Sequence, residues 1–206
     1  MKSLLKLTFK TVITLGTLAI LVYFAWTYII PKLSERDARE HDSKLNEQNR
    51  KEAYVRRVVD GDTFEIDEKD NSGKYLHVRL LGVDTPEKYQ SDKMDRDSER
   101  SGKDKETIKK LGEISSKFAK NMIEGKKVIL MPEENYEDKD KYGRLLRYVY
   151  LEDGTFFNMK LVEEGYATAF RTYNISKKND FIKAENKARE QKKGLWGEVN
   201  GLQQLQ

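Results

Sequence analysis

The sequence contains no cysteine and only two histidines among its 206 residues. The absence of cysteine excludes disulfides, thiolate metal sites and cysteine nucleophiles, and it leaves the redox compartment open. His41 falls in a charged spacer and His77 in a predicted strand, where solvated or structural roles are expected. Candidate functional groups are therefore sought among the carboxylates and the basic side chains.

Acidic residues are absent from the first 31 positions, which contain Lys2, Lys6 and Lys10. These lysines account for most of the formal net charge of +4, so the rest of the chain carries +1. Bulk charge therefore does not indicate a nucleic-acid binder, and any attraction for polyanions must be local. Charged residues make up 36% and hydrophobic residues 37% of the composition, which fits a globular domain with a strongly polar surface.

Charge is also missing from residues 12–30, an apolar run of the length that spans a bilayer. Tyr23, Trp26 and Tyr28 gather toward its end, as aromatic residues do at membrane interfaces. We expect an uncleaved transmembrane anchor within residues 1–31. The alternative is a cleaved secretory signal, although no small-x-small cleavage site precedes this end of the run. Lysines before the run and acids after it place the N-terminus in the cytoplasm and the rest outside.

The charge pattern divides the remaining chain. Residues 32–53 are highly charged and hold too few apolar side chains for a core, so they are expected to form a solvated spacer. The folded domain is expected at residues 54–197, and residues 198–206 are expected to be a disordered tail. Within the domain, residues 88–106 are almost devoid of apolar side chains and are predicted to form a long mobile loop.

Periodicity and turn residues give the fold class. The predicted strands are residues 55–59, 64–66, 75–83, 128–131 and 145–151. The predicted helices are residues 108–122, a short helix capped by Asn158, and residues 176–192, after which Leu195 and Trp196 dock onto the body. Five short strands with a helix after the third fit a small closed barrel of the α+β class.

Three local patterns carry candidate chemistry, and each has a structural alternative. Residues 60–63, Asp-Gly-Asp-Thr, also fit a simple hairpin turn, since residues 153–155 form a similar turn with no chemistry nearby. Residues 79–87 place an arginine in a buried strand and two carboxylates at its end, which also fits an internal salt bridge. Residues 140–144, Asp-Lys-Tyr-Gly-Arg, also fit a polar turn before a strand.

Taken together, the three patterns favour a site. Carboxylates with a backbone carbonyl suit a hard cation such as calcium. Two arginines beside such a cation match a phosphoryl group, because guanidinium pairs bidentately with phosphate. A free glutamate next to them can orient or deprotonate water. These groups suffice to hydrolyse a phosphodiester.

The chain resembles the thermonuclease family, the staphylococcal nuclease-like domains. The matching segments, in the family's order and approximate spacing, are residues 60–63, 79–87, 140–144 and 194–196. The resemblance covers roughly residues 54–197. It implies a five-stranded OB-type barrel with three helices, and calcium-dependent cleavage of DNA and RNA to fragments with 3′-phosphate ends.

The resemblance also implies the role of each site residue. Calcium would be bound by the carboxylates of Asp62 and Asp84 and the backbone carbonyl of Thr85. Glu87 would be the general base, or the group that positions water. The scissile phosphate would be held, and its transition state stabilised, by Arg79 and Arg144. The nucleotide would be contacted by Lys141, Tyr142 and Tyr173.

Two departures from the family bear on substrate preference: the longer, more charged segment 88–106, and Arg171 where an aromatic residue is expected. The expected protein is a monomer, attached to the cell membrane by a single span, with DNA and RNA as substrates and no protein partner. A secreted form after signal cleavage is the alternative location. The rival functions are a non-catalytic barrel that binds nucleic acid or protein, and a scaffold at the membrane.

Overall fold

The computed structural model describes residues 23, 25–29, 49–134 and 136–198. The chain divides into two units, Met1–Asn49 and Arg50–Gln206. In the first unit the described helix is a short π-helix, η1 (Ala25–Ile29). Among the described residues no helix is both long and apolar enough to cross a membrane. Most of the predicted anchor at residues 12–30, most of the spacer and residues 199–206 lie outside the described residues.

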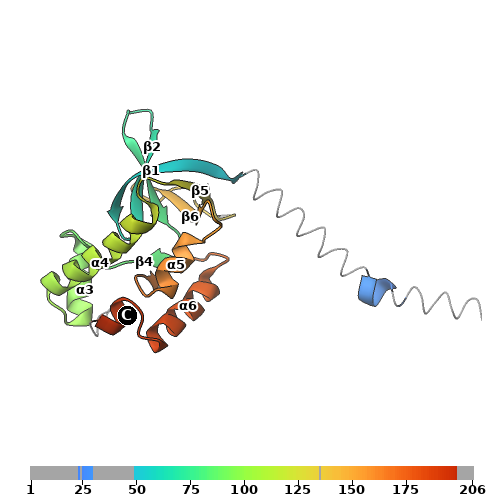
Figure 1. The fold of residues 1–206 in the computed structure, drawn as a ribbon. Helices are drawn as coiled ribbons and strands as arrows, with labels where there is room; N and C mark the ends of the chain where they lie inside the picture. Colours follow the sequence, from blue (N-terminus) through green and yellow to red (C-terminus); the bar gives the residue numbers. More distant parts are fainter. Residues whose placement is uncertain (1–22, 24, 30–48, 135, 199–206) are drawn as a thin grey trace, which may run out of the picture. The chain divides into compact units, whose positions relative to one another are not determined.

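The second unit is built on a five-stranded closed barrel in the order β1-β2-β3-β6-β5 (Figure 1). Its strands are β1 (Lys51–Asp60), β2 (Thr63–Lys69), β3 (Tyr75–Leu80), β5 (Lys127–Met131) and β6 (Leu145–Leu151). Neighbouring strands are antiparallel except β3 and β6, which are parallel. The predicted barrel of five strands is confirmed, and its form is consistent with an OB-type fold.

The barrel interior explains an irregular spacing in β1. Val55 and Val58 are both buried although they are three residues apart, whereas a regular strand buries every second residue. The pairing of β1 with β2 shifts between Val55 and Arg57, which marks a β-bulge. The extra residue returns the apolar side chains to the inner face, where they meet Phe64 and Ile66 of β2.

The predicted single strand over residues 75–83 is wrong, because the chain breaks at Gly82. Gly82 has φ +77, a left-handed conformation that favours glycine. After this turn, β4 (Val83–Asp84) leaves the barrel and pairs with β7 (Thr168–Ala169). Leu80, Leu81 and Val83 are nevertheless fully buried, as the sequence indicated.

The helices gather on one side of the barrel (Figure 1). The three predicted helices are observed as α4 (Lys105–Ile123), α5 (Phe157–Glu163) and α6 (Lys178–Glu190). Leu195 and Trp196 begin the short α7 (Leu195–Glu198) and are buried, so this end of the chain docks onto the body as expected.

Asn158 does not cap α5, contrary to the prediction. The residue before the helix is Phe156, and Asn158 lies inside it, fully buried. The Asn158 side chain accepts a hydrogen bond from the Val149 N–H (2.9 Å) and donates to the carbonyls of Leu81 (2.9 Å) and Arg147 (3.2 Å). It therefore joins β6 to the turn that leads into β4.

The predicted mobile loop at residues 88–106 is also wrong, because it contains the helix α3 (Asp92–Ser101). Ser91 caps its start by accepting from the Met94 N–H, and Gly102 ends it in the left-handed conformation. Met94 is the one buried apolar side chain among the described side chains of this helix. Caps and charges, which an apolar periodicity does not reveal, therefore define α3.

Gly82→Ala is expected to destabilise the fold more than Gly73→Ala does. Both glycines have positive φ, so both substitutions cost roughly 1–2 kcal/mol of backbone strain. A Cβ at Gly82 would lie 2.4 Å from the Phe181 ring, whereas a Cβ at Gly73 has nothing within 4 Å. The overpacking adds roughly 1–3 kcal/mol. Guanidinium unfolding of the two variants measures the difference, and equal losses would contradict this account of the β3–β4 turn.

Candidate active site

The centre of the site is the buried guanidinium of Arg79 on β3. One of its nitrogens lies 2.8 Å from Asp62 Oδ2 and donates to the Val83 carbonyl at 3.0 Å. The other terminal nitrogen donates to Asp84 Oδ1 at 2.9 Å. Burying a guanidinium is costly unless anions meet it, and here two carboxylates do so. Arg79 thereby joins the β1–β2 turn, β3 and β4 at one point.

Asp62 also accepts hydrogen bonds from Thr85, the residue that follows β4. Asp62 Oδ2 accepts hydrogen bonds from both the N–H and the hydroxyl of Thr85, each at 3.0 Å. Burial would raise the pKa of Asp62, but the charges of Arg79 and Lys93 outweigh it and lower the pKa below its usual range. The carboxylate is therefore ionised and fixed beside Asp84 and Thr85.

A third cation, Lys93 of α3, reaches the same carboxylates. Its Nζ donates to the Thr85 carbonyl at 2.8 Å and lies 3.3 Å from Asp84 Oδ2. It also lies 3.4 Å from Glu87 Oε1 and 3.3 Å from Asp97 Oδ2. Burial acts to lower the pKa of Lys93, but these carboxylates outweigh it and raise the pKa. Lys93 is therefore a charged ammonium group among oxygen atoms.

The pKa values of Asp84 and Asp60 are raised, partly by the negative charge of Asp62. Burial raises the pKa of Asp84, while Lys93 and Arg79 act to lower it. Burial and the neighbouring Asp62 raise the pKa of Asp60 to about 6. Asp60 also accepts hydrogen bonds from the Gly61 N–H (2.8 Å) and the Ser116 hydroxyl (2.9 Å). It thereby connects the turn to α4.

Arg144 approaches from the turn before β6. Its Nε donates to Asp140 Oδ2 at 2.7 Å, and a terminal nitrogen donates to the Thr63 hydroxyl at 3.4 Å. Thr63 in turn donates to Asp62 Oδ1 at 3.0 Å. One residue, Thr63, therefore separates Arg144 from the carboxylate cluster, and the Arg144 side chain is 29% exposed.

Glu87 is positioned by close packing of its backbone on α4. A Cβ at Gly112 of α4 would lie 2.5 Å from the Glu87 carbonyl carbon, so only glycine allows this approach. The Glu87 side chain is half-buried and makes its ion pair with Lys93. A partly exposed carboxylate beside an ammonium group can accept a proton or orient a water molecule.

The predicted nucleotide-contacting residues lie around the Arg144 turn. Tyr142 is 72% exposed, with its ring 5.0 Å from Lys141 Nζ and 5.5 Å from the Arg144 guanidinium carbon. Tyr173 is half-buried against Tyr136, at 5.5 Å between ring centroids. Burial raises the pKa of Tyr173. The charge of Arg79 acts to lower this pKa, and the charge of Asp140 acts to raise it. An exposed aromatic face beside cations suits a base and its phosphate.

Arg171 and the histidines have structural surroundings. Arg171 lies 3.0 Å from the carboxylate of Glu185, which is fully buried in α6, and it donates to the Ala169 carbonyl. The unexpected arginine therefore compensates a buried charge beside β7. His77 lies 3.5 Å from Glu65 in the barrel wall, and His41 lies outside the described residues.

Sequence reasoning missed three charged residues of the site, Lys93, Asp97 and Asp60. Lys93 and Asp97 are four residues apart, which is the spacing of an ion pair on one helix face. That spacing was the available signal, and it becomes informative only when the segment is recognised as a helix. Asp60 was visible in the Asp-Gly-Asp motif as a second carboxylate.

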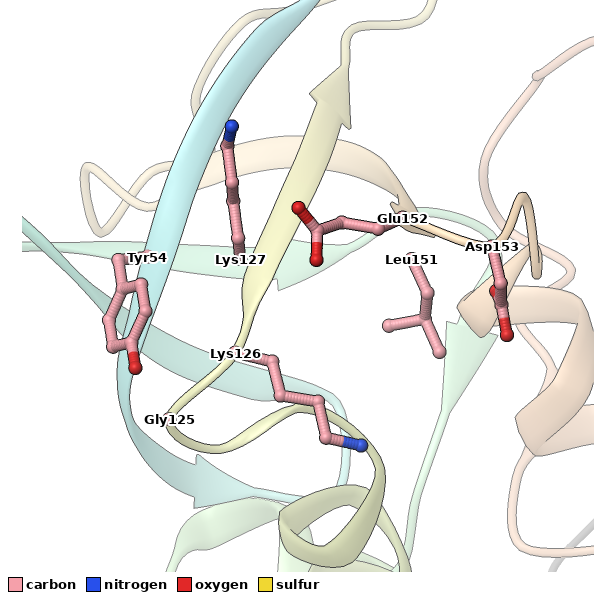
Figure 2. Close-up of a pocket in the computed structure, with 7 residues that line it drawn as sticks. All are labelled: Tyr54, Gly125, Lys126, Lys127, Leu151, Glu152 and Asp153. Carbon is pink, nitrogen blue, oxygen red and sulfur yellow. The ribbon is translucent and has the colours of Figure 1, made fainter.

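The hollow shown in Figure 2 is separate from these residues. Its volume is about 450 Å³, and it lies where β1, the start of β5 and the end of β6 meet. It is lined mainly by Tyr54, Lys126, Lys127, Leu151, Glu152 and Asp153. None of the predicted site residues is among them.

The oxygen atoms of the site bear on whether it can bind a calcium ion. Within the described residues, no group of three or more His, Cys, Asp or Glu side chains is arranged to hold a metal. The predicted set is smaller, with two carboxylates and one carbonyl. The Thr85 carbonyl and Asp84 already converge on the ammonium of Lys93, so these oxygens suit a cation. The donor set is all oxygen, which fits calcium.

Comparison with known proteins gives concordant matches. The family model of the staphylococcal nuclease homologues matches residues 77–198. A thermonuclease of Staphylococcus hyicus is 36% identical over 155 residues, which are 75% of this chain and 79% of the relative. An uncharacterized endonuclease of Escherichia coli O157:H7 is 32% identical over 146 residues, 71% and 77% of the two chains. An uncharacterized protein of Methanocaldococcus jannaschii is 33% identical over 152 residues, 71% and 72%.

Proposed function

The chain belongs to the family of staphylococcal nuclease homologues, and we propose that it is a calcium-dependent nuclease that hydrolyses DNA and RNA. The observation that carries the proposal is the meeting of Asp62 and Asp84 at the Arg79 guanidinium. Glu87 and Arg144 lie one contact further out, through Lys93 and Thr63. Acids, a glutamate and two arginines from separate segments thus share one surface.

The metal would be held by the carboxylates of Asp62 and Asp84 and the carbonyl of Thr85. Calcium bound there would neutralise charge on the phosphate and favour ionisation of the attacking water. A site with few protein ligands binds calcium weakly, which suits the millimolar concentrations found outside cells.

The protein's own residues divide the remaining work. Glu87 orients a water molecule and accepts its proton. Arg79 and Arg144 donate hydrogen bonds to the phosphate oxygens, and these bonds strengthen as negative charge develops in the transition state. In-line attack expels the 5′ oxygen of the next sugar and leaves a 3′-phosphate. Lys141, Tyr142 and Tyr173 hold the adjoining nucleotide.

Glu87→Gln and Arg144→Ala are each expected to lower kcat by at least about a hundredfold, since each removes a group that acts on the transition state. Initial rates on a fluorescent oligonucleotide measure the loss. Arg57→Ala is the matched control for Arg144, because Arg57 forms a comparable exposed ion pair, with Glu65, within the barrel. Glu113→Gln, on the exposed face of α4, is the control for Glu87. A loss under tenfold in a site variant would refute its assigned role.

Removal of calcium is expected to abolish cleavage. The full-length chain in mild detergent is incubated with DNA and with RNA, first in millimolar calcium and then with excess chelator. Products are tested for 3′-phosphate by their labelling before and after phosphatase treatment. Equal cleavage with chelator would disprove the metal requirement. Binding of nucleic acid without cleavage in calcium would instead support the non-catalytic barrel.

We further propose that residues 12–30 anchor the protein in the cell membrane with the nuclease domain outside. The support is the uncharged run itself, with lysines before it and aromatic residues near its end. The intact mass of the protein purified from the membrane fraction is expected to include the first 31 residues. A mass that lacks them, found in the medium, would show a cleaved signal.

A further inference from the structure

The ammonium group of Lys93 contacts oxygens that the proposed function assigns to the metal ion. Its contacts are the Thr85 carbonyl at 2.8 Å, Asp84 Oδ2 at 3.3 Å and Glu87 Oε1 at 3.4 Å. Two of these three residues are the proposed metal ligands, and the third is the proposed base. Two cations on one set of oxygens repel each other strongly outside bulk water, so an ammonium group and a metal ion compete for these oxygens.

We propose that Lys93 is a built-in competitor for the cation site. Its ammonium neutralises Asp84 and Glu87 when calcium is scarce, and calcium displaces it when calcium is abundant. The inference rests on the proposed function, because it concerns the regulation of the same site. The proposed step exchanges the Lys93 ammonium for a calcium ion at these oxygens, and no covalent bond forms or breaks.

Helix α3 gives the lysine a defined position. Ser91 caps the helix two residues before Lys93, and the next residue, Met94, is buried in the body. The Lys93 side chain is 26% exposed, so most of its stem is covered while its end reaches the carboxylates. The ammonium is therefore delivered by an ordered element that packs against α4.

The same helix provides a second place for the ammonium after displacement. Asp97 lies one turn along α3 and is 3.3 Å from Lys93 Nζ. Rotation of the lysine side chain toward Asp97 keeps one ion pair while it releases Asp84, Thr85 and Glu87. The exchange therefore requires no unfolding of α3, and it frees the proposed base together with the metal ligands.

The consequence is a higher calcium threshold. A ligand that must first displace an internal group binds more weakly by the fraction of molecules in the competent state. Calcium affinity is therefore weaker in the natural chain than in a chain without the Lys93 charge. The site is therefore filled only at a higher calcium concentration than its ligands would require without Lys93.

Calcium binding to the full-length chain in mild detergent, measured by titration calorimetry, tests the inference without any activity assay. Lys93→Met removes the charge and keeps an apolar stem, and it is expected to tighten binding by about tenfold or more. Lys105→Met is the matched control, because Lys105, the first residue of α4, forms its ion pair with Asp95 of α3 rather than with a carboxylate of the candidate site. It is expected to change the affinity by less than about twofold.

The outcomes separate the two proposals. If neither the natural chain nor Lys93→Met binds calcium at millimolar concentration, the metal-dependent function itself is overturned. If the natural chain binds calcium and Lys93→Met binds it no more tightly, the competition is overturned while the nuclease assignment stands.

A second measurement uses the unaltered protein and so does not depend on the folding of a variant. Acetylation of individual lysines is followed by mass spectrometry as calcium is added. The rate at Lys93 is expected to rise as its ammonium leaves the carboxylates, while the rate at Lys105 stays constant. An unchanged Lys93 rate at calcium saturation would overturn the inference.

Discussion

The structure depends on one buried cation, the Arg79 guanidinium, and on the anions that compensate it. Asp62 comes from the β1–β2 turn and Asp84 from β4, so the ion pairs fix three segments relative to one another. Removing either carboxylate would leave the buried guanidinium with one ion pair instead of two and with a donor that has lost its partner, which is unfavourable. The same ion pairs therefore stabilise this end of the barrel and fix the geometry of the candidate site.

The site lies where the barrel ends and the helical part begins. Gly82 turns the chain out of β3, and Asn158 fixes the Leu81 carbonyl at that turn. Beyond it, Gly112 allows the backbone of Glu87 to lie directly on α4. These three residues are uncharged, and each fixes the backbone next to Asp84 or Glu87. A few uncharged residues thus fix the backbone positions from which the charged side chains approach one another.

The barrel and much of the site could be predicted because their signals are local. Apolar alternation marked the strands, and residues 79–87 hold an arginine, two acids and a proline in one continuous stretch. Helix α3 could not be found in this way, since its ion pairs reach Asp84 and Glu87, which precede it in the chain. Asn158 was misplaced as a cap for a related reason, because its three hydrogen bonds connect elements distant in sequence.

The parallel pairing of β3 with β6 determines when the barrel can close during synthesis and folding. Leu146 of β6 is the neighbour of Arg79, yet 66 positions intervene along the polypeptide, so closure is a slow, long-range event. During synthesis on the ribosome, Asp62 and Arg79 emerge well before the strand that completes their wall. The surroundings of Arg79 are therefore complete only after β6, which ends at Leu151, has been synthesised.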